Sequence, residues 1–209
     1  MNCLLCHNDS NDFEADTFLC PVCKLVFKNP DIFLSAEEDV TRYSHHNNIS
    51  TDQGYLDFLG KLVNPLKEFL PKKFTALDFG CGPGPTLSGL LENLGGVVEN
   101  YDPIFFPDGH LLIPDSYDVV TSTEVVEHFK TPGFDWEILV GLVKDGGLLG
   151  IMTQIYSPDI DYSKWWYKND PTHIVFYQKE TFDFIAEKYN LEILYCDNKS
   201  ITIFKKRDF

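Results

Sequence analysis

The sequence is short of positive charge. Its 209 residues include 17 Lys and Arg against 32 Asp and Glu, which gives a formal net charge of -15. Affinity for nucleic acid depends largely on basic side chains that neutralise phosphates, so a nucleic-acid substrate is disfavoured. The one dense basic run is Lys205-Lys206-Arg207. We therefore expect a small-molecule or carrier-bound partner.

Long apolar runs and a secretory leader are also missing. No segment approaches the roughly 20 apolar residues that a membrane-spanning helix requires. The first residues, Met1 to Cys6, lack the basic start and the apolar centre of a signal peptide. These features predict a cytoplasmic protein without a membrane segment. The length fits one ordinary domain with a small appendage, and no pattern indicates an oligomeric state.

Four of the six cysteines lie near the start of the chain. Cys3 and Cys6 form one C-x-x-C knuckle, Cys20 and Cys23 form a second, and thirteen residues separate them. Each knuckle presents two thiolates to one ion, and Zn²⁺ binds four sulfur ligands tetrahedrally. The alternative is two disulfides, which would need an oxidising compartment that the missing signal peptide argues against. We predict a structural zinc module over residues 1–30.

A glycine-rich turn follows a short apolar strand in the middle of the chain. The strand is predicted over Phe74–Phe79, and the sequence Gly80-Cys81-Gly82-Pro83-Gly84-Pro85 follows it. Glycine lets the backbone approach a ligand closely and adopt positive φ. A turn between a parallel strand and a helix also gathers backbone N–H groups at the sheet edge. The next predicted strand ends in Asp102, where a doubly wound fold holds ribose hydroxyls, so we predict a nucleoside-binding site.

The turn departs from a dinucleotide fingerprint, because Pro85 stands at the last small-residue position of G-x-G-x-x-G/A. Its form, acid–x–Gly–x–Gly–x–Gly, resembles motif I of the class I S-adenosylmethionine (SAM) methyltransferases. Asp102-Pro103 resembles their ribose-binding acid, and the run from Ser116 to Phe129 is similar to their fourth strand and the loop after it. The resemblance extends from about Phe74 to the C-terminus and implies SAM as cofactor. The implied cofactor-binding residues are Asp78, Gly80, Cys81, Gly82, Gly84, Asp102, Ser122 and Thr123.

Apolar patterns predict an alternating order of elements after residue 73. Strands are predicted at 74–79, 97–101, 117–122, 147–155, 191–196 and 200–205, with helices at 84–93, 133–144 and 179–188. Such alternation implies a parallel sheet with helices on both faces. The last two strands form a hairpin, so the final strand should run antiparallel, as in the family. The predicted fold class is α/β, a Rossmann-like class I methyltransferase sheet with a small N-terminal zinc ribbon.

Three regions are predicted along the chain: the zinc module at 1–30, a helical linker or lid at 31–72, and the SAM-binding domain at 73–209. In the helical region, Tyr55, Phe58, Leu59 and Leu62 recur at helical spacing, and Pro65 marks a break. The adjacent His45 and His46 cannot present ligands on one helix face, so no site is predicted there.

One segment departs from the family pattern. Fifteen residues with three prolines separate Asp102 from Asp118, whereas the family usually fits a helix and a third strand there. That unit does not fit in the available length. Phe105 and Phe106 are predicted either to cover the adenine or to pack as core aromatics.

Candidate catalytic groups gather in two predicted loops: Glu124, Glu127 and His128 after the 117–122 strand, and His173 in the connection 156–178. Ligands bind at the carboxyl ends of such strands, so both loops should approach the transferred methyl. The pattern E-x-x-E-H with a downstream His resembles the small-RNA 2′-O-methyltransferases and the O-methyltransferases of ubiquinone biosynthesis. This resemblance implies a Mg²⁺ or Mn²⁺ ion that lowers the pKa of an acceptor hydroxyl. The alternative is metal-free catalysis with His173 or His128 as general base.

The sequence therefore predicts a SAM-dependent methyltransferase that acts on a small or carrier-bound molecule at oxygen. The N-terminal cysteines also resemble those of the sugar C-methyltransferases and some ribosomal-RNA base methyltransferases, so these activities stay open. A SAM-binding regulatory or interaction protein without catalysis is the alternative from another class. Trp165 and Trp166 are expected either to line an acceptor pocket or to pack under the zinc module.

Overall fold

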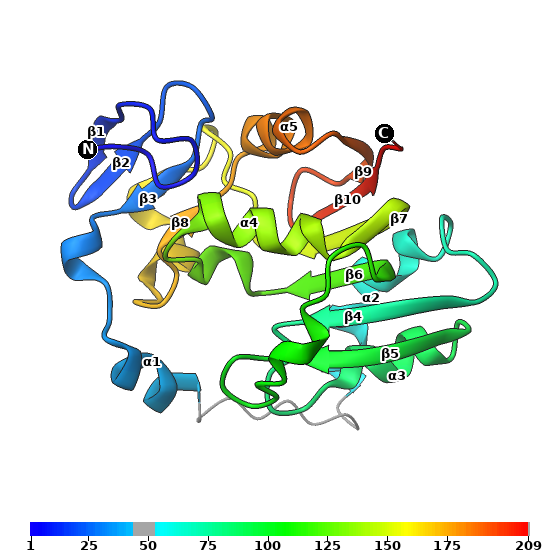
Figure 1. Cartoon of the computed structure of the whole chain (residues 1–209). Coiled ribbons are helices and arrows are strands. Elements are labelled where there is room, and N and C mark those ends of the chain that lie inside the picture. The colour runs from blue at the N-terminus through cyan, green and yellow to red at the C-terminus, as the bar shows by residue number, and fades with distance from the viewer. Residues whose placement is uncertain (44–52, 209) are drawn as a thin grey trace.

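The computed structural model describes residues 1–43 and 53–208, and it is built on a six-stranded sheet (Figure 1). The strand order is β5-β4-β6-β7-β10-β9. The strands are β4 (Phe74–Phe79), β5 (Gly96–Tyr101), β6 (Tyr117–Thr123), β7 (Val143–Met152), β9 (Leu191–Cys196) and β10 (Ile201–Lys206). The first four pair in parallel, and β10 is antiparallel to both of its neighbours. The predicted Rossmann-like sheet with an antiparallel last strand is confirmed.

Helices cover both faces of this sheet. The helices are α1 (Ala36–Tyr43), α2 (Gln53–Leu66), α3 (Thr86–Glu92), α4 (Pro132–Gly141) and α5 (Lys179–Lys188). On one face α2 and α3 bury Leu62 and Leu91 against the strands, and on the other face α4 and α5 bury Trp136 and Phe182. Burial of such a side chain contributes about 1.5–3 kcal/mol, so the two apolar layers fix the sheet between the helix pairs. His45 and His46 lie outside the described residues.

Several predicted boundaries were wrong. The strand expected at 147–155 runs over Val143–Met152, and the helix before it ends at Gly141 rather than at 144. The cause is an irregularity in the pairing of β7 with β6, where Val143 faces Tyr117 and Leu148 faces Val119. Gly146 takes a φ of 74° inside it, which a glycine adopts without steric cost. Pro65 lies inside the last turn of α2 and does not end the helix before it.

Short 3-10 helices occupy several of the connections. They are η1 (Pro30–Ile32), η2 (Gly109–Leu111), η3 (Val126–His128), η4 (Tyr162–Lys164) and η5 (Trp166–Asn169). The described segment between β5 and β6 contains η2 and no strand, as the length and the prolines predicted. Among the described helices, none is both long and apolar enough to cross a membrane.

The cysteine module, residues 1–30, shares a second sheet with the main domain. Its strands β1 (Asn11–Glu14), β2 (Thr17–Leu19) and β3 (Val26–Lys28) pair in that order, and β3 then pairs with β8 (Val175–Phe176). Leu5, Leu25 and Phe27 are fully buried in the same core cluster as α4 and α5. The module therefore packs on the main domain through both backbone pairing and an apolar core.

Candidate active site and cysteine cluster

The glycine turn lies at the carboxyl ends of β4 and β5. The Gly80 N–H donates to the carbonyl of Tyr101 at 2.7 Å. Gly80 and Gly82 have φ of 78° and 65°, the left-handed region that side chains disfavour. A Cβ atom at Gly80 would lie 2.3 Å from a methyl carbon of Val125 in the loop after β6. Glycine is required at Gly80 by its backbone conformation and by this contact.

Asp102 organises the turn from the end of β5. Its Oδ2 accepts the N–H of Gly82 at 3.0 Å, and its Oδ1 accepts the N–H groups of Ile104 and Phe105 at 2.8 and 3.0 Å. A carboxylate offers about four lone-pair positions, so these three bonds leave room for a further donor. Phe106, which follows, is 37% exposed, and its backbone pairs with that of Asp102 in an isolated bridge.

Asp78 lies inside β4 beneath the turn. Its carboxyl accepts the hydroxyl of Thr121 at 3.0 Å. Burial raises the pKa of Asp78 to about 7, and the charge of Asp102 adds to this rise while the Thr121 hydrogen bond opposes it. Ser122, next on β6, is fully buried and its hydroxyl has no partner among the described residues, whereas Thr123 is half-buried.

The two loops that carry the candidate catalytic residues meet around a buried tyrosine. The Tyr167 hydroxyl donates to Glu127 Oε1 at 2.5 Å and lies 3.2 Å from both Glu124 Oε2 and Thr153 Oγ1. Its ring centroid is 4.1 Å from that of His173. Tyr167 comes from η5, forty residues after Glu127, so the structure joins the two loops through this side chain.

His128 and His173, predicted either as ligands of one ion or as alternative general bases, lie side by side. The ring centroids of His128 and His173 are 4.8 Å apart. Each ring places Nδ1 at 2.8 Å from a backbone carbonyl, that of Thr172 for His128 and that of Tyr167 for His173. A carbonyl only accepts, so each Nδ1 is assigned the proton and each Nε2 carries the lone pair. The arrangement leaves both imidazoles able to accept a proton or bind an ion through Nε2.

Burial tunes the acids and bases of this site. It raises the pKa of Glu124 to about 8, and the charge of Glu127 adds to the rise. It lowers the pKa of His173, which keeps that imidazole neutral near pH 7. Glu124 also has a φ of 53°, a conformation that a non-glycine residue adopts at a cost, and such positions concentrate at functional sites.

Unpartnered oxygens mark the same place. Glu127 Oε2 and Glu124 Oε1 are buried and have no hydrogen-bond partner among the described residues. Glu127, His128 and His173 offer ligand atoms that all lie within 4.8 Å of one another. A carboxylate and two imidazoles at this separation form a set that binds a divalent ion or exchanges protons.

Sequence reasoning assigned no role to Tyr167, although it lies between the two tryptophans and His173. No local pattern distinguishes this tyrosine from its aromatic neighbours, because its partners are far away in sequence. The two tryptophans differ in burial. Trp165 packs among Tyr156, Phe176 and module residue Val26, while Trp166 is 66% exposed.

The four N-terminal cysteines form one cluster. The sulfurs of Cys3 and Cys23 are 3.5 Å apart, those of Cys6 and Cys20 are 3.4 Å apart, and all four lie within 4.8 Å. All six cysteines of the chain are free. A tetrahedral ion with sulfur ligands at about 2.3 Å would separate the sulfurs by about 3.8 Å. The cluster therefore has the dimensions of a four-sulfur metal site.

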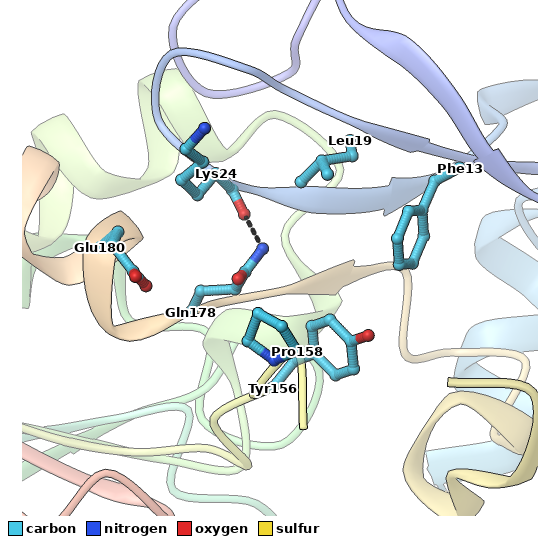
Figure 2. Close-up of a pocket in the computed structure, with 7 residues that line it drawn as sticks. All are labelled: Phe13, Leu19, Lys24, Tyr156, Pro158, Gln178 and Glu180. Atoms are coloured by element: carbon cyan, nitrogen blue, oxygen red, sulfur yellow. Dashed lines mark hydrogen bonds between the residues drawn. The ribbon is translucent and has the colours of Figure 1, made fainter. Parts of the chain in front are cut away.

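A cavity of about 260 Å³ lies where the cysteine module meets the main domain (Figure 2). Its lining residues are Phe13, Leu19 and Lys24 from the module and Tyr156, Pro158, Gln178 and Glu180 from the main domain. The side-chain N–H of Gln178 donates to the Lys24 carbonyl at 2.7 Å. The lining includes none of the predicted cofactor or catalytic residues.

Comparison with known proteins identifies the class. The family model described as a methyltransferase domain matches residues 51–195, and the chain belongs to this family. It is a SAM-dependent methyltransferase. No curated protein shows significant sequence similarity to it.

Solved structures share the fold at low identity. The 1,6-didemethyltoxoflavin-N1-methyltransferase of Burkholderia thailandensis, with bound 1,6-didemethyltoxoflavin and S-adenosylhomocysteine, is 13% identical with a TM-score of 0.61, covering 96% of this chain and 100% of that chain. The PH0226 protein from Pyrococcus horikoshii is 16% identical with a TM-score of 0.52, covering 80% and 99%. A chain from a Haloferax volcanii complex containing the Trm112 methyltransferase activator is 14% identical with a TM-score of 0.57, covering 82% and 98%.

Proposed function

We propose that this enzyme transfers the methyl group of SAM to a hydroxyl oxygen of a small or carrier-bound acceptor. The observation that carries the proposal is the cluster of Glu124, Glu127, His128 and His173, which gathers bases beside the carboxyl end of β6. Ligands of parallel α/β sheets bind at that edge. An acceptor hydroxyl must lose its proton during transfer, and this cluster supplies groups for that task.

The cofactor is proposed to lie along the glycine turn. Its methionine part would follow Gly80, Cys81, Gly82 and Gly84, and its ribose would donate to the remaining lone-pair position of Asp102. The buried Ser122 hydroxyl and the adjoining Thr123 complete the predicted contacts. Asp78 beneath the turn supports a cationic cofactor, because a positive sulfonium and ammonium stabilise its ionised form.

The proposed chemistry is an in-line displacement. The acceptor oxygen attacks the methyl carbon, the C–S bond breaks to leave S-adenosylhomocysteine, and the hydroxyl proton moves to Nε2 of a neutral imidazole. His173 suits this role, because burial lowers its pKa and the Tyr167 carbonyl fixes its Nδ1 proton. The Tyr167 hydroxyl holds the Glu127 carboxylate beside the pair.

The same donor set fits a divalent ion, since Glu127 Oε2 is buried beside two imidazoles and has no hydrogen-bond partner among the residues that the structure describes. Such an ion would be held by Glu127, His128 and His173, and it would supply a Lewis acid for the acceptor hydroxyl. Mg²⁺ and Mn²⁺ are the candidates that the sequence resemblance suggests.

We also propose that Cys3, Cys6, Cys20 and Cys23 hold one structural Zn²⁺. The sulfur separations support this assignment, and so do the N–H groups of the Cys23 backbone and the Asn8 side chain, which approach the sulfurs of Cys20 and Cys6 at 3.5 and 3.4 Å. Such donors around thiolates orient metal ligands.

The test is a screen for consumption of SAM against fractionated metabolite pools, with mass spectrometry to locate the methylated atom. Once an acceptor is found, His173→Ala should lower turnover by roughly 10²–10⁴-fold while SAM affinity stays within about twofold. His110→Ala, a change at an exposed histidine outside the site, is the matched control and should leave both unchanged. A chelator that abolishes turnover, followed by recovery with Mg²⁺ or Mn²⁺, would establish the metal route.

Methylation of carbon or of a nucleic-acid base in this screen would contradict the oxygen assignment. SAM binding without methyl transfer to any pool would favour the non-catalytic alternative.

A further inference from the structure

The cysteine module touches both loops that form the candidate catalytic cluster. The first knuckle contacts the start of α4, just after Glu127 and His128, and the second leads into β3, which pairs with β8 just after His173; the predicted metal would join the knuckles to each other. These contacts bear on the geometry of the candidate catalytic cluster as well as on the folding of the module.

The first knuckle contacts the helix that follows Glu127 and His128. The backbone N–H of Gly133, in the first turn of α4, donates to the Leu4 carbonyl at 3.1 Å. The fit there is tight, because a Cβ atom at Gly133 would lie 3.0 Å from the Leu5 carbonyl oxygen. Leu4 and Leu5 lie between Cys3 and Cys6, so this knuckle fixes the position of the α4 start.

The second knuckle leads directly into β3, which pairs with β8 and so holds the segment that bears His173. The Lys28 N–H donates to the Ile174 carbonyl at 2.8 Å, and the Lys28 ammonium donates to the Asp170 carbonyl at 2.9 Å. The backbone N–H of His173 approaches that same Asp170 carbonyl at 3.2 Å. Beyond β8, the Gln178 side chain reaches the carbonyl of Lys24, the residue after Cys23 (Figure 2).

The two loops also form hydrogen bonds directly to each other. The Ile174 N–H donates to the Glu127 carbonyl at 2.9 Å, and His128 Nδ1 lies 2.8 Å from the Thr172 carbonyl. These bonds set the separation of the histidines, and the module braces them from both sides. A change in the distance between the knuckles would strain these direct hydrogen bonds, so the module and the bonds together hold Glu127 and His128 near His173.

We propose that the four-cysteine cluster positions the catalytic loops: a metal bound there ties the two knuckles together and holds His173 beside Glu127 and His128. Its loss separates these groups and stops methyl transfer while SAM binding persists. The glycine turn and Asp102 follow β4 and β5, which lie beyond β6 from the module in Figure 1, and the module strands β1, β2 and β3 belong to a separate sheet. The expected effect on methyl transfer rests on the proposed function. The link between the module and the positions of the two loops does not.

Hydrogen exchange of backbone amides tests the coupling without an acceptor. The zinc-loaded protein is compared with protein depleted by a thiol-competing chelator, and calorimetry with S-adenosylhomocysteine accompanies each measurement. We expect exchange of the Lys28 and Ile174 amides to rise at least tenfold on depletion. Amides of β4 and β6 should keep their protection, and cofactor affinity should stay within about twofold. Unchanged exchange at Ile174 would overturn the proposal, and so would loss of protection throughout β4 and β6, because the module would then act on folding as a whole.

Two pairs of variants test the same coupling in the metal-loaded protein. Gly133→Ala wedges the first knuckle away from α4, and its matched control is Gly141→Ala, on the same helix, where a Cβ meets nothing within 4 Å. Lys28→Met removes the ammonium contact to Asp170, and Lys28→Arg should restore it. Gly133→Ala and Lys28→Met should raise exchange at Ile174 without metal release, and Gly141→Ala should not.

Once an acceptor is identified, Gly133→Ala and Lys28→Met should each lower kcat at least tenfold. The KM for SAM should stay within about twofold of the parent value. If exchange responds as expected and kcat does not, the coupling stands and the catalytic assignment of the cluster fails. A further outcome is that His173→Ala lowers kcat while exchange of the Ile174 amide stays unchanged on metal depletion and in the module variants. In that case the positioning role of the module is refuted and the proposed function stands.

Discussion

Replacement of Asp78 by asparagine tests how burial raises the pKa of the carboxyl beneath the glycine turn. The carboxyl is completely enclosed, and burial raises its pKa to about 7 from an ordinary value of 3.8. The folded state therefore binds the proton more tightly than the unfolded state does between these values. Because the native protein binds more protons, the free energy of unfolding falls as pH rises through this window.

The size of this effect follows from the two pKa values. Each unit of difference corresponds to about 1.4 kcal/mol, so the full loss across the window is about 4 kcal/mol. Between pH 5 and pH 8 the linkage relation gives about 2.5 kcal/mol, because part of the loss has already occurred at pH 5. An asparagine keeps an acceptor for the Thr121 hydroxyl but does not ionise, so the variant should lack this component.

The assay is urea denaturation of both proteins at pH 5, 6.5 and 8. Relative to the parent, Asp78→Asn should gain about 2.5 kcal/mol in unfolding free energy between the two extremes. Asp118→Asn is the matched control, because a pKa lowered from 3.8 changes the free energy of unfolding only near and below that pH, so its profile should run parallel to that of the parent between pH 5 and 8. Burial alone would raise the pKa of Asp118, but hydrogen bonds from Lys144 and Thr75 outweigh burial and lower it. Parallel pH profiles for the parent and Asp78→Asn, within about 0.5 kcal/mol, would refute the reasoning.

Three further outcomes are expected. Asp102→Ala should weaken S-adenosylhomocysteine binding at least tenfold by calorimetry, since a ribose hydrogen bond to a charged acceptor contributes roughly 1.5–3 kcal/mol; undiminished affinity would contradict the ribose assignment. Gly80→Ala should lower the free energy of unfolding by about 1–3 kcal/mol in denaturation, because its Cβ would meet Val125 at 2.3 Å, and Val125→Ala should restore part of the loss if that contact is the cause. Cys6→Ser should abolish the binding of one zinc ion per chain in elemental analysis, whereas Cys196→Ser, outside the cluster, should retain it.

Much of the sheet was predictable because local signals coincide with the tertiary fold. The closing hairpin is an example: Asp197 Oδ1 accepts the N–H groups of Lys199, Ser200 and Ile201, and Asn198 has a φ of 55°. Asp and Asn favour such turns for this chemical reason. The short β5–β6 connection was predictable from its length and prolines alone.

The candidate catalytic cluster was predictable only in part. Glu124, Glu127 and His128 share one loop after a recognisable strand, so their proximity follows from spacing. The pairing of β3 with β8 leaves no sequence signal, since β8 has two residues and lies nearly 150 positions after β3. The contact of Tyr167 with Glu127 depends on that pairing and on the course of a loop without regular strands. Long-range contacts of this kind require the structure.

Gly80 belongs both to a local sequence pattern and to a long-range contact in the fold. The sequence alone explains the glycine turn by the close approach of a ligand, which constrains only the residues of the turn. In the structure, Gly80 also accommodates Val125, which stands between Glu124 and the η3 residues Glu127 and His128. A larger residue at Gly80 would displace the candidate catalytic loop at Val125 as well as the glycine turn itself. The glycine turn and the loop after β6 thus share the contact at Val125, which gives a physical reason why a glycine at the end of β4 and an acidic loop after β6 occur together in this chain.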